Sequence, residues 1–309
     1  MRDRSIGRRA VLRIAGGAAL LVGCAPGRIH TGWTPGSGRE PLRLVFYTDV
    51  HAGPGEGRRA ALAAAAAAIN AERAGLVIGG GDYVSDGFAL SAAVMRPYWD
   101  AFMTMHDALG GERHAAIGNH DLVGALGPDG AGRPRDGREE FRARFGIRET
   151  YYSFDRGGRH FVLLDSIQVT GGALGYRGWV DDAQLGWLER DLARVAPTTP
   201  IVVVTHLPLV TALYAATEGA TASAPADRVV VNSREVLARF GRHPLQLVLQ
   251  GHLHVREEIR FGDTTFLTGG AVSGAWWRGA FHGTPPGFNV VTLHDDRVEC
   301  EYRTYDVRT

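Results

Sequence analysis

Five apolar segments of this 309-residue chain each end in residues that can bind a metal ion. The segments are 42–47, 76–78, 114–117, 200–205 and 245–249, and the residues after them are, in order, Asp49 and His51; Asp82; Asn119 and His120; His206; His252 and His254. Short apolar runs bounded by turn residues are typical of buried strands. Because functional residues of α/β folds collect at the carboxyl ends of strands, these side chains are expected to meet.

The first third of the chain repeats the order strand, loop and helix. Residues 58–74 are rich in alanine, the best helix former, and Gly75 is expected to end that helix. A second helix is expected from about Ala89 to Leu109. Such alternation predicts a parallel sheet. Hydrophobic residues make up 45% of the chain, and neither a repeat nor a change of composition follows residue 40, so we expect one two-sheet α/β domain.

The second half of the chain is richer in strands. Strands are expected at 151–154, 160–165, 255–261, 264–267, 288–293 and 298–305, the first two as an antiparallel pair. Further helices are expected at 139–145, 184–195 and 232–240, the last opened by a capping box of Asn232 and Glu235. Residues 124–137 are expected to form a surface loop near the site, and residues 207–231 a cap or loop over it.

Each metal-type motif has an ordinary explanation when it is taken alone. Asp-x-His and Gly-Asp are common in turns, and a lone histidine such as His206 is more often a hydrogen-bonded polar residue than a ligand. Gly251-His252-Leu253-His254 is more specific, because imidazoles two residues apart in an extended chain share a face. Five coincidences, all at the ends of apolar strands, favour a metal site.

Taken in order, Asp-x-His, Gly-Asp, Gly-Asn-His-Asp, His and Gly-His-x-His resemble the motifs of the calcineurin-like metallophosphoesterase superfamily over about residues 42–300. The resemblance implies an α/β fold, a four-layer α/β/β/α sandwich of two mixed sheets, with two metal ions at the carboxyl ends of strands. It also implies a ligand set: Asp49, His51 and His254 for one metal, Asn119, His206 and His252 for the other, and Asp82 as a bridge.

The ligand types indicate which metals and which chemistry to expect. Carboxylates and imidazoles without thiolates suit Fe, Mn or Zn better than Mg or Ca. Two such ions about 3.5–4 Å apart activate a bridging hydroxide for in-line attack on phosphorus and neutralise the phosphoryl oxygens. His120, which lies beside a ligand but is not assigned to a metal, is the expected acid for the leaving group. Either Asp121 or Asp86 is expected to orient His120.

Departures from the patterns of individual subfamilies narrow the comparison. Purple acid phosphatases have a motif similar to Gly-Asp-x-x-Tyr, and Ser85 takes the place of its tyrosine in this chain. They also lack the histidine of the first motif, which is His51 here. Protein serine/threonine phosphatases place a second carboxylate one residue before Asp86, and an arginine where this chain has Ile117. The remaining similarity is to small bacterial phosphodiesterases of the cyclic-nucleotide type, although a protein outside the cytoplasm would not meet a cytoplasmic second messenger.

Residues 1–24 have the features of an export signal: a basic start, then a short apolar stretch too rich in glycine for a membrane span. Arg8-Arg9 resembles the twin-arginine motif, and Leu21-Val22-Gly23-Cys24 resembles a lipobox in which Cys24 is lipidated. Residues 25–40 are expected to be a flexible tether, and 41–309 the metallophosphoesterase domain. We therefore expect a periplasmic or cell-surface protein attached to the membrane through Cys24. A plain secretory signal is the alternative.

A formal net charge of +1 gives no sign of nucleic-acid binding, and a small phosphorylated substrate is expected. Hydrolysis of phosphomonoesters or diesters is the leading function. The alternatives are hydrolysis of nucleotide or lipid-linked pyrophosphates, and a non-catalytic, surface-anchored binding lipoprotein. The stretch Trp276-Trp277-Arg278 is either a stacking and phosphate-contacting wall or ordinary aromatic packing. Cys300 lies in an alternating run and is expected to be a small buried residue, not a ligand.

Overall fold

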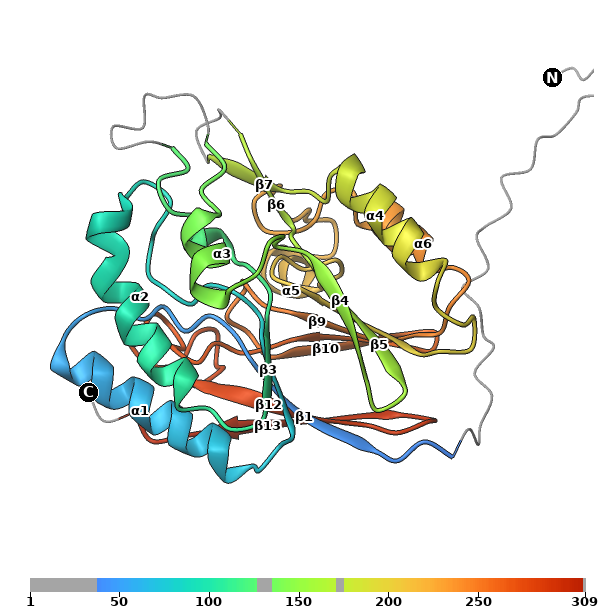
Figure 1. Ribbon diagram of the computed structural model, residues 1–309, viewed down its shortest axis with the longest axis horizontal. Helices are drawn as coiled ribbons and strands as arrows, with labels where there is room; N and C mark the ends of the chain where they lie inside the picture. The colour runs from blue at the N-terminus through green and yellow to red at the C-terminus, as the bar shows by residue number, and fades with distance from the viewer. Residues whose placement is uncertain (1–37, 127–134, 171–174, 308–309) are drawn as a thin grey trace, which may run out of the picture.

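The computed structural model describes residues 38–126, 135–170 and 175–307 (Figure 1). The expected signal segment and most of the expected tether lie outside the described residues. No helix within these three ranges is long and apolar enough to cross a membrane.

The first sheet has five strands in the order β13-β12-β1-β2-β3. Strands β1 (Leu42–Tyr47), β2 (Leu76–Gly79) and β3 (Glu112–Ala115) run parallel to one another, as the strand–helix alternation predicts. Strands β12 (Gly287–Leu293) and β13 (Val298–Thr304) extend the sheet in antiparallel fashion from β1. The carboxyl ends of β1, β2 and β3 therefore open at one edge.

The second sheet has six strands in the order β10-β11-β9-β8-β5-β4. Its centre is parallel and consists of β5 (Arg159–Leu164), β8 (Ile201–Thr205), β9 (Leu245–Gln250) and β11 (Thr264–Thr268). The antiparallel edge strands are β10 (Glu257–Phe261) and β4 (Tyr152–Arg156). The prediction of an α/β fold with two mixed sheets is confirmed.

The two sheets pack face to face, with helices on their outer sides. Alternate side chains of β1 separate the two interfaces: Leu44 and Phe46 join the core between the sheets, whereas Val45 and Tyr47 face the helical layer. Helices α1 (Glu56–Ala71) and α2 (Ala92–Asp107) pack together outside the first sheet. Helices α4 (Asp182–Leu192) and α6 (Ser233–Arg239) pack together outside the second (Figure 1). The arrangement is the expected four-layer sandwich.

Several predicted boundaries shift, and two strands were not predicted. Helix α1 ends before Gly75, and β3 lies two residues earlier than expected. Helix α3 (Glu139–Phe145) matches its prediction, and the short helix α5 (Leu213–Glu218) lies inside the predicted cap. Strands β6 (Ile167–Val169) and β7 (Tyr176–Gly178) form a separate pair, too short for their alternation to be visible in sequence.

The predicted capping box at Asn232 is wrong. Asn232 precedes α6, but its side chain makes no capping hydrogen bond to that helix. Instead its Oδ1 accepts the N–H of Val180 at 3.1 Å, and its Nδ2 donates to the Val180 carbonyl at 2.8 Å. The buried amide satisfies a backbone segment before α4, and this use leaves it unable to cap α6.

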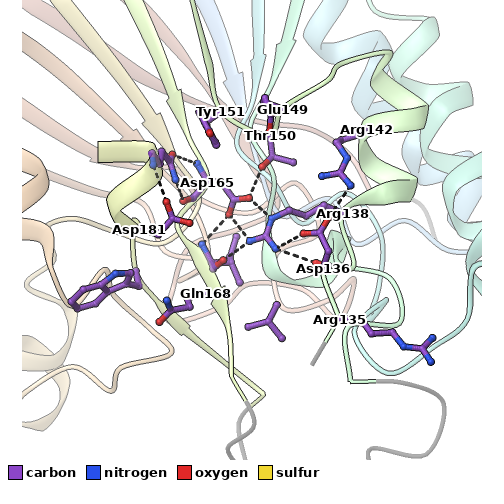
Figure 2. A pocket seen from close by; sticks show the side chains of 14 residues that line it. Arg135, Asp136, Arg138, Arg142, Glu149, Thr150, Tyr151, Asp165, Gln168 and Asp181 are labelled. Carbon is purple, nitrogen blue, oxygen red and sulfur yellow. Dashed lines mark hydrogen bonds and ion pairs between the residues drawn. The ribbon is translucent and has the colours of Figure 1, made fainter. Parts of the chain in front are cut away.

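A buried ion pair joins α3 to the end of β5 beside a cavity of about 440 Å³ (Figure 2). Arg138 Nε and Nη2 lie 2.5 and 3.2 Å from the two oxygens of Asp165, which also accepts the hydroxyl of Thr150 at 2.6 Å. On the rim of the same cavity, Arg142 pairs with the more exposed Asp136 at 2.8 Å. The first pair anchors the segment that leads from β5 into β6.

Replacing Arg138 with methionine should lower the free energy of unfolding by about 3–5 kcal/mol, because it leaves Asp165 charged, buried and without its cation. Arg142→Met, whose ion pair is more exposed, is the matched control and should cost less than about 1 kcal/mol. Urea denaturation with an unchanged slope measures both. Equal losses in the two variants would show that Asp165 does not depend on Arg138.

His160 on β5 makes stability depend on pH. Its Nδ1 lies 2.7 Å from Asp155 on β4, and its Nε2 lies 2.9 Å from Asp191 on α4. Burial opposes protonation, but the hydrogen bonds to these two carboxylates outweigh it and raise the pKa of His160.

Protonated His160 should therefore stabilise the fold fully below the unfolded pKa of about 6.5, and this contribution should be lost as the pH rises through the higher folded pKa. The difference in unfolding free energy between the wild type and His160→Gln should accordingly be large at pH 5.5 and small at pH 9. Urea titrations at the two pH values measure it. A difference that does not change with pH would contradict the role of the charge.

Candidate metal centre

Five loops bring the predicted ligands together at the carboxyl ends of β1, β2, β3, β8 and β9. Three groups of side chains place one ligand atom each within 4.8 Å of one another: Asp49, His51 and His254; His51, Asp82 and His120; and Asp82, His206 and His252. The groups share members, so the residues form one continuous cluster. Since β8 and β9 belong to the second sheet, the cluster lies where the open edges of both sheets meet.

The first group joins the loop after β1 to the loop after β9. The Nε2 atoms of His51 and His254 are 3.0 Å apart, and His254 Nε2 lies 3.2 Å from Asp49 Oδ1. His51, Asp49 and His254 are all buried. Three donor atoms that converge at this spacing, in a region without solvent, are suited to a cation bound among them.

Asp82 occupies the centre of the cluster. Its Oδ2 lies 3.1 Å from Nε2 of His206, and 3.9 Å from Nε2 of both His51 and His120. Its Oδ1 is held separately, by the backbone N–H of His120 at 2.8 Å. Oδ2 therefore faces both His51, expected to bind one metal, and His206, expected to bind the other. A ligand that bridges two metal ions requires this position.

Five buried atoms of the predicted ligands have no hydrogen-bond partner within the described structure. They are Asp49 Oδ1, His51 Nδ1, Asn119 Oδ1, His206 Nε2 and His252 Nδ1. Buried polar atoms are nearly always paired, and a set of orphans in one place calls for an explanation. Oxygen and nitrogen donors from carboxylate, amide and imidazole fit Fe, Mn or Zn. The residues present therefore fit a dimetal site.

Backbone carbonyls fix which nitrogen of each histidine faces the centre. Nδ1 of His206 donates to the Gly80 carbonyl at 2.8 Å, and Nδ1 of His254 donates to the Gly274 carbonyl at 2.6 Å, so Nε2 of each ring faces the other ligands. His252 is reversed: its Nε2 donates to the Asp227 carbonyl at 3.0 Å, and its Nδ1 is free. Such outer hydrogen bonds set the tautomer of metal-binding histidines.

The ligand loops adopt backbone conformations that ordinary residues avoid. Positive φ angles occur at five of the predicted ligands: Asp49 (55°), His51 (46°), Asp82 (55°), His252 (70°) and His254 (56°). Such strain persists only where surrounding structure enforces it, and it concentrates at functional sites. Close packing contributes to the enforcement: a Cβ atom on Gly118 would lie 2.2 Å from the backbone N of Asp82.

Burial and mutual charge set the protonation of the cluster. Burial, with His120 and His254 nearby, lowers the pKa of His51 to about 3. Burial likewise lowers the pKa of His252 to about 3, with help from His206 and from the more distant Arg228. Burial alone would raise the pKa of Asp49, but His254 and His206 outweigh it and lower the value to about 2. Burial also opposes protonation of His206 and His254, but Asp82 outweighs it and raises the pKa of His206 to about 9, and Asp49 outweighs it and raises the pKa of His254. Metal ions bind neutral imidazoles and ionised carboxylates, so metal binding would displace protons from these two rings.

His120 lies beside Asp82, and the backbone of Asp86 positions it. The N–H of Asp86 donates to Nδ1 of His120 at 3.0 Å, which places the hydrogen of a neutral ring on Nε2. Of the two residues expected to orient His120, Asp86 does so through its backbone N–H, and Asp121 does not contact the ring. Asp121 is fully buried and directs both oxygens to backbone N–H groups, those of Gly118, Asp82 and Tyr83, at 2.8–2.9 Å.

The cluster forms one side of a cavity of about 310 Å³. Its other walls include the side chains of Phe88, Tyr176, Asp227 and Arg228, none of which belongs to a metal-type motif. Asp227 and Arg228 belong to the segment 207–231, so the prediction of a cap over the site is confirmed for its end. The places of Phe88 and Tyr176 in the cavity wall could not be predicted because neither belongs to a recognisable motif.

Trp276 fits the interpretation of a wall at the site, whereas Trp277 fits that of ordinary aromatic packing. Trp276 lines the cavity, is 40% exposed, and lies with its ring centroid 4.3 Å from that of His254. Trp277 is buried, donates its Nε1 hydrogen to the His51 carbonyl at 3.1 Å, and lies under Arg58. Arg278 is exposed and does not line the cavity. Only Trp276 is thus placed to contact a substrate.

Comparison with known proteins agrees with this geometry. Among solved structures, similar folds include a dimetal phosphatase from Danio rerio (TM-score 0.60, 16% identity, 85% of this chain and 96% of that one). GAP50, the anchor in the inner membrane complex of Plasmodium, is also similar (TM-score 0.53, 16% identity, 85% of this chain and 84% of that one). A third similar fold is that of a purple acid phosphatase from yellow lupin seeds (TM-score 0.50, 18% identity, 86% of this chain and 52% of that one).

At these identities the structural similarity shows the fold alone. No curated protein matches the chain. A model of the calcineurin-like phosphoesterase family, however, matches residues 42–256, which is more than half of the sequence and contains every predicted ligand. With its histidine and aspartate clusters intact and buried, the chain belongs to the calcineurin-like phosphoesterase family of metal-dependent enzymes.

Proposed function

We propose that this metallophosphoesterase hydrolyses small phosphoesters, with two metal ions held by Asp49, His51, Asp82, Asn119, His206, His252 and His254. The observation that carries the proposal is the set of buried, unpartnered donor atoms in five of these residues. Two further features support metal binding. Asp82 directs one oxygen to the expected ligands of both metals, and backbone carbonyls fix the ring orientation of three histidines.

The ions, when bound, would activate a water molecule for in-line attack and withdraw charge from the phosphoryl group. His120 is proposed as the acid. Its Nε2 faces the cluster, 3.9 Å from Asp82 Oδ2, and carries the hydrogen because Nδ1 accepts the N–H of Asp86. A protonated ring there would pass a proton to the leaving oxygen as its bond to phosphorus breaks, and the Nε2 hydrogen of a neutral ring would stabilise the charge of that oxygen by a hydrogen bond. Asp121 has an indirect role, since it holds the backbone of both the Asp82 and the Asn119 loops.

Metal analysis of the purified protein, coupled to hydrolysis of generic monoester and diester substrates, tests this function. Chelation should abolish turnover, and reloading with Fe, Mn or Zn should restore it. A panel that includes nucleoside diphosphates separates ester hydrolysis from the pyrophosphate alternative. Full activity of metal-stripped protein, or inactivity with every metal and substrate, would refute the proposal.

A binding role without catalysis is the second candidate, and the anchor protein GAP50 shares the fold. A protein that only binds a partner would need neither a complete set of metal ligands nor an acid for a leaving group. All seven ligand residues and His120 are nevertheless present. The same metal and turnover measurements decide between the two, because a binding protein would load metal and turn over nothing.

We also propose that the protein is exported and attached to the membrane through a lipidated Cys24. The support is the order of basic start, apolar stretch and lipobox-like Leu21-Val22-Gly23-Cys24 in the sequence. Cell fractionation and mass spectrometry of the mature N-terminus test this assignment. An unmodified chain in the cytoplasm would contradict it.

A further inference from the structure

The cavity over the metal ligands contains a single arginine, Arg228, among the described residues that line it. The side chain is 44% exposed, and its Nε lies 3.5 Å from Asp227 Oδ2. This contact is longer than a hydrogen bond, and the guanidinium keeps donors that a ligand in the cavity can use. The sequence motifs assign no role to Arg228.

The backbone around Arg228 is fixed to the metal centre. The carbonyl of the preceding residue, Asp227, accepts the Nε2 hydrogen of the ligand His252 at 3.0 Å. On either side, the Ala226 carbonyl accepts the N–H of Gly178 at 2.7 Å, and the N–H of Val230 donates to the Pro208 carbonyl at 2.9 Å. The segment that orients His252 therefore also holds the backbone of Arg228 beside the cavity.

The chemistry of phosphoryl groups indicates what such an arginine recognises. A planar guanidinium donates parallel hydrogen bonds to two oxygens and matches phosphate better than an ammonium group does. A monoester phosphoryl group is a dianion with three non-bridging oxygens, whereas a diester is a monoanion with two. A third positive charge, in addition to the two metal ions, therefore stabilises a bound monoester more than a bound diester. The cavity, at about 310 Å³, also lies at the small end of ligand sites.

We propose that Arg228 binds the non-bridging oxygens of the substrate's phosphoryl group and makes a dianionic phosphomonoester the preferred substrate. The proposal rests on the function proposed above. In the reaction, a water oxygen bonds to phosphorus, the ester P–O bond breaks, and the leaving oxygen takes a proton. The products are an alcohol and inorganic phosphate. Arg228 is unchanged throughout and binds substrate and product phosphate alike.

The test compares the metal-loaded wild type with Arg228→Met, Arg228→Lys and the control Arg234→Met, which alters an exposed arginine of α6 outside the cavity. The substrates are p-nitrophenyl phosphate and its methyl ester, which have the same leaving group. The wild type should prefer the monoester. Arg228→Met should lower kcat/KM for the monoester by about 10²-fold, as expected for a charge-assisted contact, and for the methyl ester by less than about 5-fold.

Binding of inorganic phosphate gives a readout that does not depend on turnover. Its inhibition constant should rise in Arg228→Met, rise less in Arg228→Lys, and stay unchanged in Arg234→Met. Metal content and melting temperature show whether each variant keeps the site. A wild type that hydrolyses the methyl ester better, or an Arg228→Met variant that loses both activities equally or neither, would overturn this inference alone. A wild type inactive on both substrates would overturn the proposed function and this inference with it.

Discussion

Replacement of Asp82 by asparagine should leave the protein folded but reduce phosphoester hydrolysis by about 10³-fold or more, since a two-metal site supplies several kcal/mol of transition-state stabilisation. Asp82 belongs to two of the three ligand groups, and its Oδ2 also lies 3.9 Å from Nε2 of His51, a member of the remaining group. Asparagine has the same shape and tolerates the left-handed backbone conformation of Asp82, whose φ is 55°. An amide oxygen carries no charge, however, and cannot bridge two cations as a carboxylate does.

The melting temperature of the Asp82→Asn variant, measured with and without metal, separates loss of the site from loss of the fold. Metal should raise the melting temperature of the wild type and raise that of the variant much less, because only ligands that bind the native state stabilise it. Asp263→Asn is the matched control. Asp263 is exposed in the turn between β10 and β11, at the amino end of β11 and hence at the opposite end of the sheet. A variant with two bound metals and normal turnover would remove Asp82 from the site.

The convergence of the proposed ligands could be predicted because each motif combines two features that are visible in sequence. One is an apolar run long enough for a buried strand, such as β8 or β9, and the other is a metal-competent residue directly after it. His206 follows β8 at once, and His252 follows β9 after one glycine. The parallel sheets then bring these ends together without further information about the loops.

Side-chain direction inside a loop was beyond the reach of the sequence. Asn119, His120 and Asp121 form one turn of 3₁₀ helix, in which the third residue points back to its start. Asp121 Oδ2 therefore accepts the Gly118 N–H at 2.8 Å instead of reaching His120. Tyr176 and Arg228 were missed for another reason: they lie in short or aperiodic segments, and only the folded chain places them at the cavity.

Replacement of His120 by asparagine should lower kcat by about 10²–10⁴-fold, the range that general acid catalysis contributes. Asparagine can still accept the Asp86 N–H through its Oδ1, so the loop should keep its position. His120 is not among the proposed metal ligands, and the variant should bind as much metal as the wild type. In this respect it should differ from Asp82→Asn, which loses activity and metal together.

The leaving group distinguishes an acid from a residue that only shapes the site. Nitrophenolate departs without a proton, whereas an alkoxide needs one, so the loss in His120→Asn should be small with p-nitrophenyl phosphate and large with an alkyl phosphate. Equal losses on both substrates would instead indicate that His120 binds the phosphoryl group, from a position 3.9 Å from Asp82 Oδ2 that suits either role.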